Sequence, residues 1–121
     1  MAAGARGTWD KGKGYDSFGP IGPWLVTADE IADPQALQLW LEVEGKRYQA
    51  GSTATMIFSV KEIISYLSRF MRLVPGDIIA TGTPPGWGWG KNRSRLFLRA
   101  GQRLRLGVEG LGEQRQLTVQ D

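Results

Sequence analysis

Residues 37–43 alternate between apolar and polar positions, with Trp40 as the one aromatic exception. The apolar set is Leu37, Leu39, Leu41 and Val43. A period of two is typical of a strand with one face toward a core. Glu44-Gly45 then predicts a tight turn into a partner strand over residues 46–50, so this region is expected to form a β-hairpin.

The carboxy-terminal region predicts a second hairpin. Residues 104–108 alternate in the same way, and Leu117 and Val119 continue the alternation in a last strand. The Gly110-Leu111-Gly112 corner is expected to join the two strands. A short β-prone run, residues 78–81, follows a Pro-Gly-Asp turn and predicts one more strand.

From Ser59 the spacing of apolar residues changes to three and four, which predicts an amphipathic helix. The apolar positions are Val60, Ile63, Ile64, Leu67, Phe70 and Met71. Ser59 and Glu62 occupy the two positions of a capping box. Arg69 and Arg72 suit the negative end of the helix dipole, and Pro75-Gly76 is expected to end the helix.

One helix among several short strands predicts a mainly β, α+β architecture. A chain of 121 residues builds at most one domain of modest size. We expect residues 1–8 to be a flexible lead-in and residues 9–121 to form the folded part. The apolar stretches are far too short to span a bilayer, and the first residues lack the apolar core of a secretory signal.

Composition narrows the possible chemistry. The chain has no cysteine and no histidine, which excludes disulfides, thiolate metal sites, a cysteine nucleophile and the usual base at neutral pH. The acidic residues show no spacing that demands a metal. Any reaction must therefore use carboxylates, lysine, hydroxyls or groups from outside the chain.

Positive charge concentrates toward the carboxy-terminal end, although the net charge is only +3. Seven basic residues lie in this region: Lys91, Arg93, Arg95, Arg99, Arg103, Arg105 and Arg115. Together with Trp87 and Trp89 they also fit a small basic β module that binds single-stranded nucleic acid. The simpler interpretation is a solvated strand edge kept from pairing by its charges.

Two glycine-rich segments, residues 11–24 and 81–90, are candidates for ligand binding. Glycine lets backbone N–H groups approach an anionic ligand closely. A lysine from the first segment and a threonine hydroxyl from the second could together hold a carboxylate or enolate oxygen. The alternative is that both segments are purely structural turns.

Four runs of sequence resemble successive motifs of the fumarylacetoacetate hydrolase family. They are KGYDSFGPIGPWLVT at residues 13–27, QAGSTATMIFSV at 49–60, LVPGDIIATGTPPG at 73–86 and GLGEQRQ at 110–116. They occur in the family's order, from about Trp9 to the last residue. The last run is most similar to members named ureidoglycolate lyases or hydrolases of 2,4-diketo-3-deoxy sugar acids.

The resemblance implies part of a mixed β-roll fold, a homo-oligomer and a cytoplasmic enzyme. Family members hydrolyse, isomerise or decarboxylate small 2-oxo and diketo acids with Mg²⁺ or Mn²⁺, which the substrate's 2-oxo-carboxylate group chelates. No membrane or nucleic-acid partner is implied.

Carried over by position, Lys13 matches the family's active-site lysine, and Thr83 matches its substrate-contacting threonine. Ser17 matches a position near the metal, while Gly82 and Gly86 shape the loop around Thr83. The family's acidic metal ligands lie upstream of the segment that begins near Trp9. We therefore expect a truncated form that binds no metal and is inactive alone.

Overall fold

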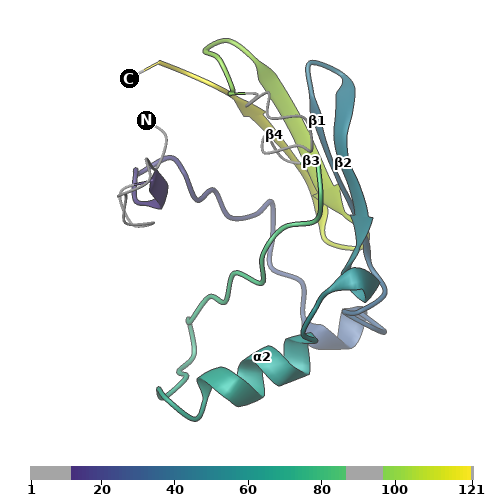
Figure 1. The fold of residues 1–121 in the computed structure, drawn as a ribbon, viewed down its shortest axis with the longest axis vertical. Helices are drawn as coiled ribbons and strands as arrows, with labels where there is room; N and C mark the ends of the chain where they lie inside the picture. Colours follow the sequence, from purple (N-terminus) through teal and green to yellow (C-terminus); the bar gives the residue numbers. More distant parts are fainter. Residues whose placement is uncertain (1–11, 87–96, 121) are drawn as a thin grey trace.

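A computed structural model describes residues 12–86 and 97–120 (Figure 1). The elements that lie wholly within these residues are a four-stranded antiparallel sheet in the order β2-β1-β3-β4, the α-helix α2 and two short 3-10 turns. The elements are η1 (Ala28–Glu30), β1 (Gln38–Val43), β2 (Lys46–Ser52), η2 (Thr53–Thr55), α2 (Val60–Leu67), β3 (Arg103–Val108) and β4 (Gly112–Leu117). The expected mainly β, α+β architecture is confirmed.

The first hairpin forms as predicted. Glu44 and Gly45 both adopt positive φ, 49° and 75°, which is the conformation that a two-residue turn between twisted strands requires. β2 extends two residues beyond the predicted end, to Ser52. A register shift between Leu41 and Glu42 marks an irregularity in the pairing.

The second hairpin also forms, with Gly110 and Gly112 at positive φ in its turn. The predicted last strand was placed too late, because β4 begins directly at Gly112 and ends at Leu117. Thr118 still forms backbone hydrogen bonds with Gly101 and Gln102. The segment before β3 turns at Gly101, so Val119 has no partner in β3.

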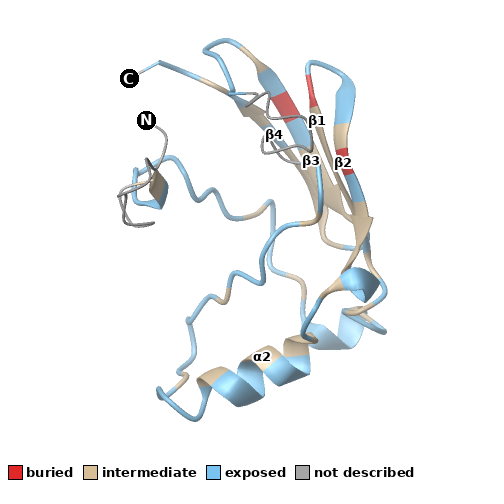
Figure 2. Cartoon of the chain, viewed as in Figure 1, coloured by how far each residue is buried: buried red, intermediate tan, exposed pale blue. Residues whose placement is uncertain are grey.

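The apolar core lies on one face of the sheet. Cross-strand partners share a face, and the apolar partners on this face are Leu39, Leu41, Val43, Leu104, Leu106 and Val108. Val43 and Leu104 pair directly, and each is only 7% exposed. With Gln49 on the same face, they are the buried residues of the described chain (Figure 2).

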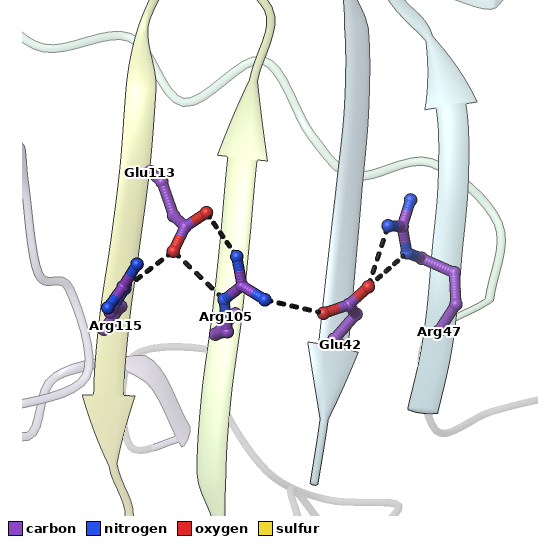
Figure 3. A network of polar contacts seen from close by, with 5 residues as sticks. All are labelled: Glu42, Arg47, Arg105, Glu113 and Arg115. Atoms are coloured by element: carbon purple, nitrogen blue, oxygen red, sulfur yellow. Dashed lines mark hydrogen bonds and ion pairs between the residues drawn. The ribbon is translucent and has the colours of Figure 1, made fainter. Parts of the chain in front are cut away.

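A ladder of alternating charges crosses the opposite face (Figure 3). From β2 to β4 it runs Arg47, Glu42, Arg105, Glu113 and Arg115, with N–O distances of 2.8, 3.6, 2.7 and 2.8 Å. Arg105 and Arg115 are cross-strand neighbours, and the Glu113 carboxylate accepts hydrogen bonds from both. The carboxylate thereby offsets the repulsion between two facing arginines.

The helix begins as predicted, with the complete capping box between Ser59 and Glu62. Its predicted end was wrong, because α2 stops at Leu67 and neither Arg69 nor Arg72 lies in its last turn. The Ser68 hydroxyl donates to the Ser65 carbonyl, and the next backbone bonds tighten to the three-residue spacing of a 3-10 turn.

Residues 78–81 do not form the predicted strand. The preceding turn is present, since the Asp77 carboxylate accepts from the Val74 backbone N–H and the Asp77 N–H donates to the Val74 carbonyl. The described sheet offers no neighbouring strand for this run. Ile78 is accordingly 72% exposed.

The described chain is open, with α2 standing apart from the sheet on an extended arm (Figure 1). Large apolar side chains are uncovered, and Leu25, Ile57 and Ile78 are 93%, 90% and 72% exposed. The described chain therefore leaves a substantial apolar surface uncovered. Among the described helices, none has the length and apolar character needed to cross a membrane.

The charge ladder predicts a specific response to acid. Hydrogen bonds from Arg105, and then from Arg115, lower the pKa of Glu113 from 4.5 to about 2. A depressed folded-state pKa means that the stabilisation is present above about pH 4.5 and is lost as pH falls toward 2. Urea unfolding should show that Glu113→Gln is less stable than the parent at pH 7 and that the difference shrinks between pH 4.5 and 2.

Glu30→Gln is the matched control, because it removes one carboxylate from the exposed η1 turn without touching the ladder. A stability difference between the parent and Glu113→Gln that stays constant from pH 7 to pH 2 would contradict the assigned role of Glu113.

Candidate functional site

The loop of residues 81–86 is held against β2 by one buried amide. The side chain of Gln49 is 8% exposed, and its Nε2 donates to Thr83 Oγ1 at 2.9 Å and to the Pro84 carbonyl at 2.8 Å. Gln49 sits on β2 opposite Leu41, so the sheet fixes its position. The sequence did not single out Gln49 as a functional residue, although it begins the 49–60 motif.

Two glycines allow this loop to approach the strand. A Cβ on Gly86 would lie 2.1 Å from the Tyr48 carbonyl oxygen, and one on Gly51 would lie 2.8 Å from Pro84 Cβ. Gly86 also has a φ of 108°, which L side chains rarely adopt. The predicted role of Gly86 in shaping the loop therefore has a concrete physical basis.

A groove of about 710 Å³ opens beside Thr83. Hydroxyl and apolar side chains line it, from β1, β2, η2, residues 56–58, α2 and the loop. Its hydroxyl-bearing residues are Ser52, Thr53, Thr55, Thr81 and Thr83. None of the described lining residues is ionisable. Such a wall suits a ligand held by directed hydrogen bonds rather than by charge.

Hydrogen bonds fix the wall opposite the loop. The Thr53 hydroxyl accepts from the Leu37 backbone N–H at 2.9 Å, and the Ser52 hydroxyl accepts from the Ala54 N–H at 3.2 Å. Gln35 bridges η2 to α2, because its Nε2 donates to the Thr53 carbonyl and its Oε1 accepts from the Val60 N–H. The groove is therefore built on anchored backbone on both sides.

The structure brings only part of the predicted site together. Gly82 and Thr83 line the groove, whereas Lys13 and Ser17 are exposed and do not. Figure 1 draws the purple amino-terminal segment and the green run that follows α2 as separate extended runs, both to the left of the sheet in this view. The assignments of Lys13 and Ser17 remain predictions.

The first segment nevertheless reaches the sheet through β4. Gln114 Nε2 donates to the Gly22 carbonyl at 2.6 Å. A Cβ on Gly112 would lie 2.7 Å from the Trp24 ring and 2.9 Å from Pro23. The 110–116 motif therefore serves to dock residues 20–24, a structural role that its sequence alone did not indicate.

The described residues do not fit a divalent cation. Mg²⁺ and Mn²⁺ prefer several carboxylate or carbonyl oxygens. Across residues 12–86 and 97–120, no three acidic, histidine or cysteine side chains gather closely enough to hold a metal.

The basic module proposed for nucleic acid falls mostly outside the described residues, which exclude Trp87, Trp89, Lys91, Arg93 and Arg95. The described arginines Arg105 and Arg115 are paired with Glu113 in the charge ladder. Of the nine residues named for this alternative, only Arg99 and Arg103 are both described and outside the charge ladder.

The family model for the fumarylacetoacetate (FAA) hydrolase C-terminal domain matches residues 1–120. The chain belongs to this family. A provisionally named hydrolase of Burkholderia multivorans is 65% identical over 112 residues, covering 93% of this chain and 40% of the relative. The chain therefore spans about 40% of the length of the curated relatives that it matches.

Solved structures agree with this assignment. Maleylpyruvate hydrolase from Sphingobium sp. SYK-6, in complex with manganese(II) and pyruvate, is 37% identical with a TM-score of 0.78, covering 88% of this chain and 37% of that one. The 2-hydroxyhepta-2,4-diene-1,7-dioate isomerase from Mycobacterium marinum is 37% identical with a TM-score of 0.79, covering 93% and 40%. The resemblance read from the sequence motifs is confirmed.

The close approach of the loop to β2 predicts unequal effects of two similar substitutions. Gly82 and Gly86 have φ of 102° and 108°, but a Cβ on Gly82 meets nothing within 4 Å. Gly82→Ala should therefore cost only the backbone strain of about 1–2 kcal/mol. Gly86→Ala should cost about 1–3 kcal/mol more, because its methyl group collides with the Tyr48 carbonyl.

Urea unfolding of the two variants measures the difference. Equal losses of stability in Gly82→Ala and Gly86→Ala would show that the loop does not pack against β2 as described.

Proposed function

We propose that this chain is the carboxy-terminal part of a catalytic domain that acts on small 2-oxo or diketo acids, folded as part of a mixed β-roll. The observation that carries the proposal is the placement of Thr83. The loop that matches the family's threonine motif presents this residue at a groove of about 710 Å³, supported from below by the buried Gln49.

The chemistry of the groove fits such ligands. A threonine hydroxyl donates a directed hydrogen bond to a carboxylate, keto or enolate oxygen. The predicted lysine, Lys13, would add positive charge if the complete site brings it to the same ligand. These contacts bind and orient a substrate, and they stabilise negative charge that develops on its oxygens.

The reaction class follows the named neighbours. Their names describe a maleylpyruvate hydrolase and a dienedioate isomerase, so we propose hydrolysis or isomerisation of an acylpyruvate-type substrate. The narrower resemblance to ureidoglycolate lyases or deoxy sugar-acid hydrolases is matched by neither of these structures and remains a prediction. The cytoplasmic location also remains a prediction.

The described residues contribute no metal site, so the complete activity requires groups from outside them. We therefore propose that the isolated chain is inactive and that it becomes active when joined by the part of the family fold that it does not match. The manganese in the Sphingobium structure indicates which metal to supply.

Co-expression tests this proposal. The chain should be produced with the part of the Burkholderia multivorans relative that it does not match, and hydrolysis of an acylpyruvate to pyruvate and a carboxylate should be followed with Mn²⁺ present. We expect hydrolysis and a one-site Mn²⁺ isotherm for the pair, and neither for the isolated chain. A micromolar one-site isotherm for the isolated chain would contradict the proposal.

Two lysine variants sharpen the assay. Lys13→Ala should lower kcat by about a hundredfold, the loss expected when a charge-stabilising group is removed. Lys61→Ala is the matched control, since Lys61 lies on α2 outside the groove beside Thr83. Equal activities in the two variants would remove Lys13 from the proposed site.

We also propose that the chain self-associates. Apolar side chains gather on and just before α2, where the exposed Phe58 and Tyr66 and the half-buried Ile63 and Leu67 line a second groove of about 880 Å³. Uncovered apolar surface of this kind promotes association. Light scattering should give a mass above the 13.3 kDa of one chain, and a compact, monodisperse monomer would refute this proposal.

A further inference from the structure

We infer that Gln49 is a positioning residue that makes Thr83 a hydrogen-bond donor toward an anionic oxygen in the groove. The inference rests on the proposed function, because it concerns how that site binds a 2-oxo acid. It extends the site by a buried residue that touches Thr83 from the side opposite the ligand.

The orientation of the Gln49 amide follows from its partners. The Pro84 carbonyl can only accept hydrogen bonds, so the atom 2.8 Å away from it must be the amide nitrogen. The same nitrogen lies 2.9 Å from Thr83 Oγ1. Gln49 therefore donates to the threonine hydroxyl and uses both of its N–H groups on this loop.

That donation determines what Thr83 offers to a ligand. A hydroxyl has one donor hydrogen and two lone pairs, and Gln49 occupies one of the lone pairs. The Thr83 hydroxyl donates to the Pro84 carbonyl at 3.5 Å, a bond at the outer limit of length, while Gln49 donates to the same carbonyl at 2.8 Å. A ligand oxygen in the groove at ordinary hydrogen-bond distance would therefore replace this long bond as the partner of the hydroxyl hydrogen.

Burial determines which side of the Gln49–Thr83 pair faces the groove. Gln49 is 8% exposed beneath the loop, whereas Thr83 is exposed above it and lines the groove. Carboxylate and enolate oxygens only accept hydrogen bonds, so they complement this donor. A neutral ligand that must itself donate at this point is disfavoured.

A double-mutant cycle tests the inference in the full 121-residue chain. Pyruvate and acetate serve as probes, and binding is followed by NMR through the Thr83 backbone amide shift. Thr83→Val removes the donor. Gln49→Glu reverses the polarity, because a carboxylate accepts from the Thr83 hydroxyl and turns its lone pairs toward the groove. Each change should weaken binding about tenfold, the loss expected for a hydrogen bond to a charged group.

The cycle separates positioning from a merely structural role. If Gln49 acts through Thr83, the double variant should bind no more weakly than Thr83→Val alone, whereas independent effects would add. Thr83→Ser should retain binding. Gln49→Met, which removes the donor without burying a charge, should repeat the result if Gln49→Glu fails to fold. Gln120→Glu, near the carboxy-terminal end, makes the same charge change outside the groove and should leave binding unchanged.

The outcomes distinguish this inference from the proposed function. Additive losses, or none at Gln49, overturn the positioning role while the 2-oxo acid proposal stands. Equal affinity for acetate and pyruvate, with the Gln49 dependence intact, supports the donor role and weakens the 2-oxo acid proposal. No shift at Thr83 with either probe in the parent chain overturns the inference.

Discussion

The central strand β1 is the element on which the rest of the described structure depends. It pairs with β2 on one side and with β3 on the other, and its Val43 packs against Leu104 in the small buried core. Gln49, which supports the Thr83 loop, is the cross-strand partner of Leu41 on β2. Gln114, which anchors residues 20–24, is the partner of Leu106 at the other edge. Both docking contacts therefore inherit their positions from the register of one strand.

The sequence predicted best where local chemistry determines the outcome. The turn at Glu44-Gly45 and the capping box at Ser59 depend on neighbouring residues alone, and both formed as expected. The predicted helix end and the predicted strand over residues 78–81 were wrong. Apolar spacing and β-propensity do not show which neighbouring elements a segment can pair with. A β-prone run becomes a strand only when another strand offers its backbone groups.

The candidate site was predictable in part for the same reason. Thr83 and Gly82 were proposed from a contiguous motif and both line one groove, while their role in binding remains a prediction. Gln49 was missed because its role depends on a contact with a loop 34 positions later in the chain. For such a contact, a single sequence shows only that a glutamine lies in a strand. A glutamine in a strand is often a solvated side chain with no further role.

The Thr83 side of the groove is held in place although much of the described chain is open. α2 and the apolar residues around it are uncovered, yet Gln49, Pro84 and the two close glycines, Gly51 and Gly86, hold the loop through contacts within the described chain. The donor side of the groove is therefore organised by about 40% of the relatives' length. A metal site has no such local support here, since the described acidic residues are dispersed and Glu42 and Glu113 are engaged in the charge ladder. In the proposed chemistry the two tasks thus separate physically: Gln49 on β2 and the loop of residues 81–86 supply hydrogen-bond donation, and metal binding would come from residues beyond the described ones.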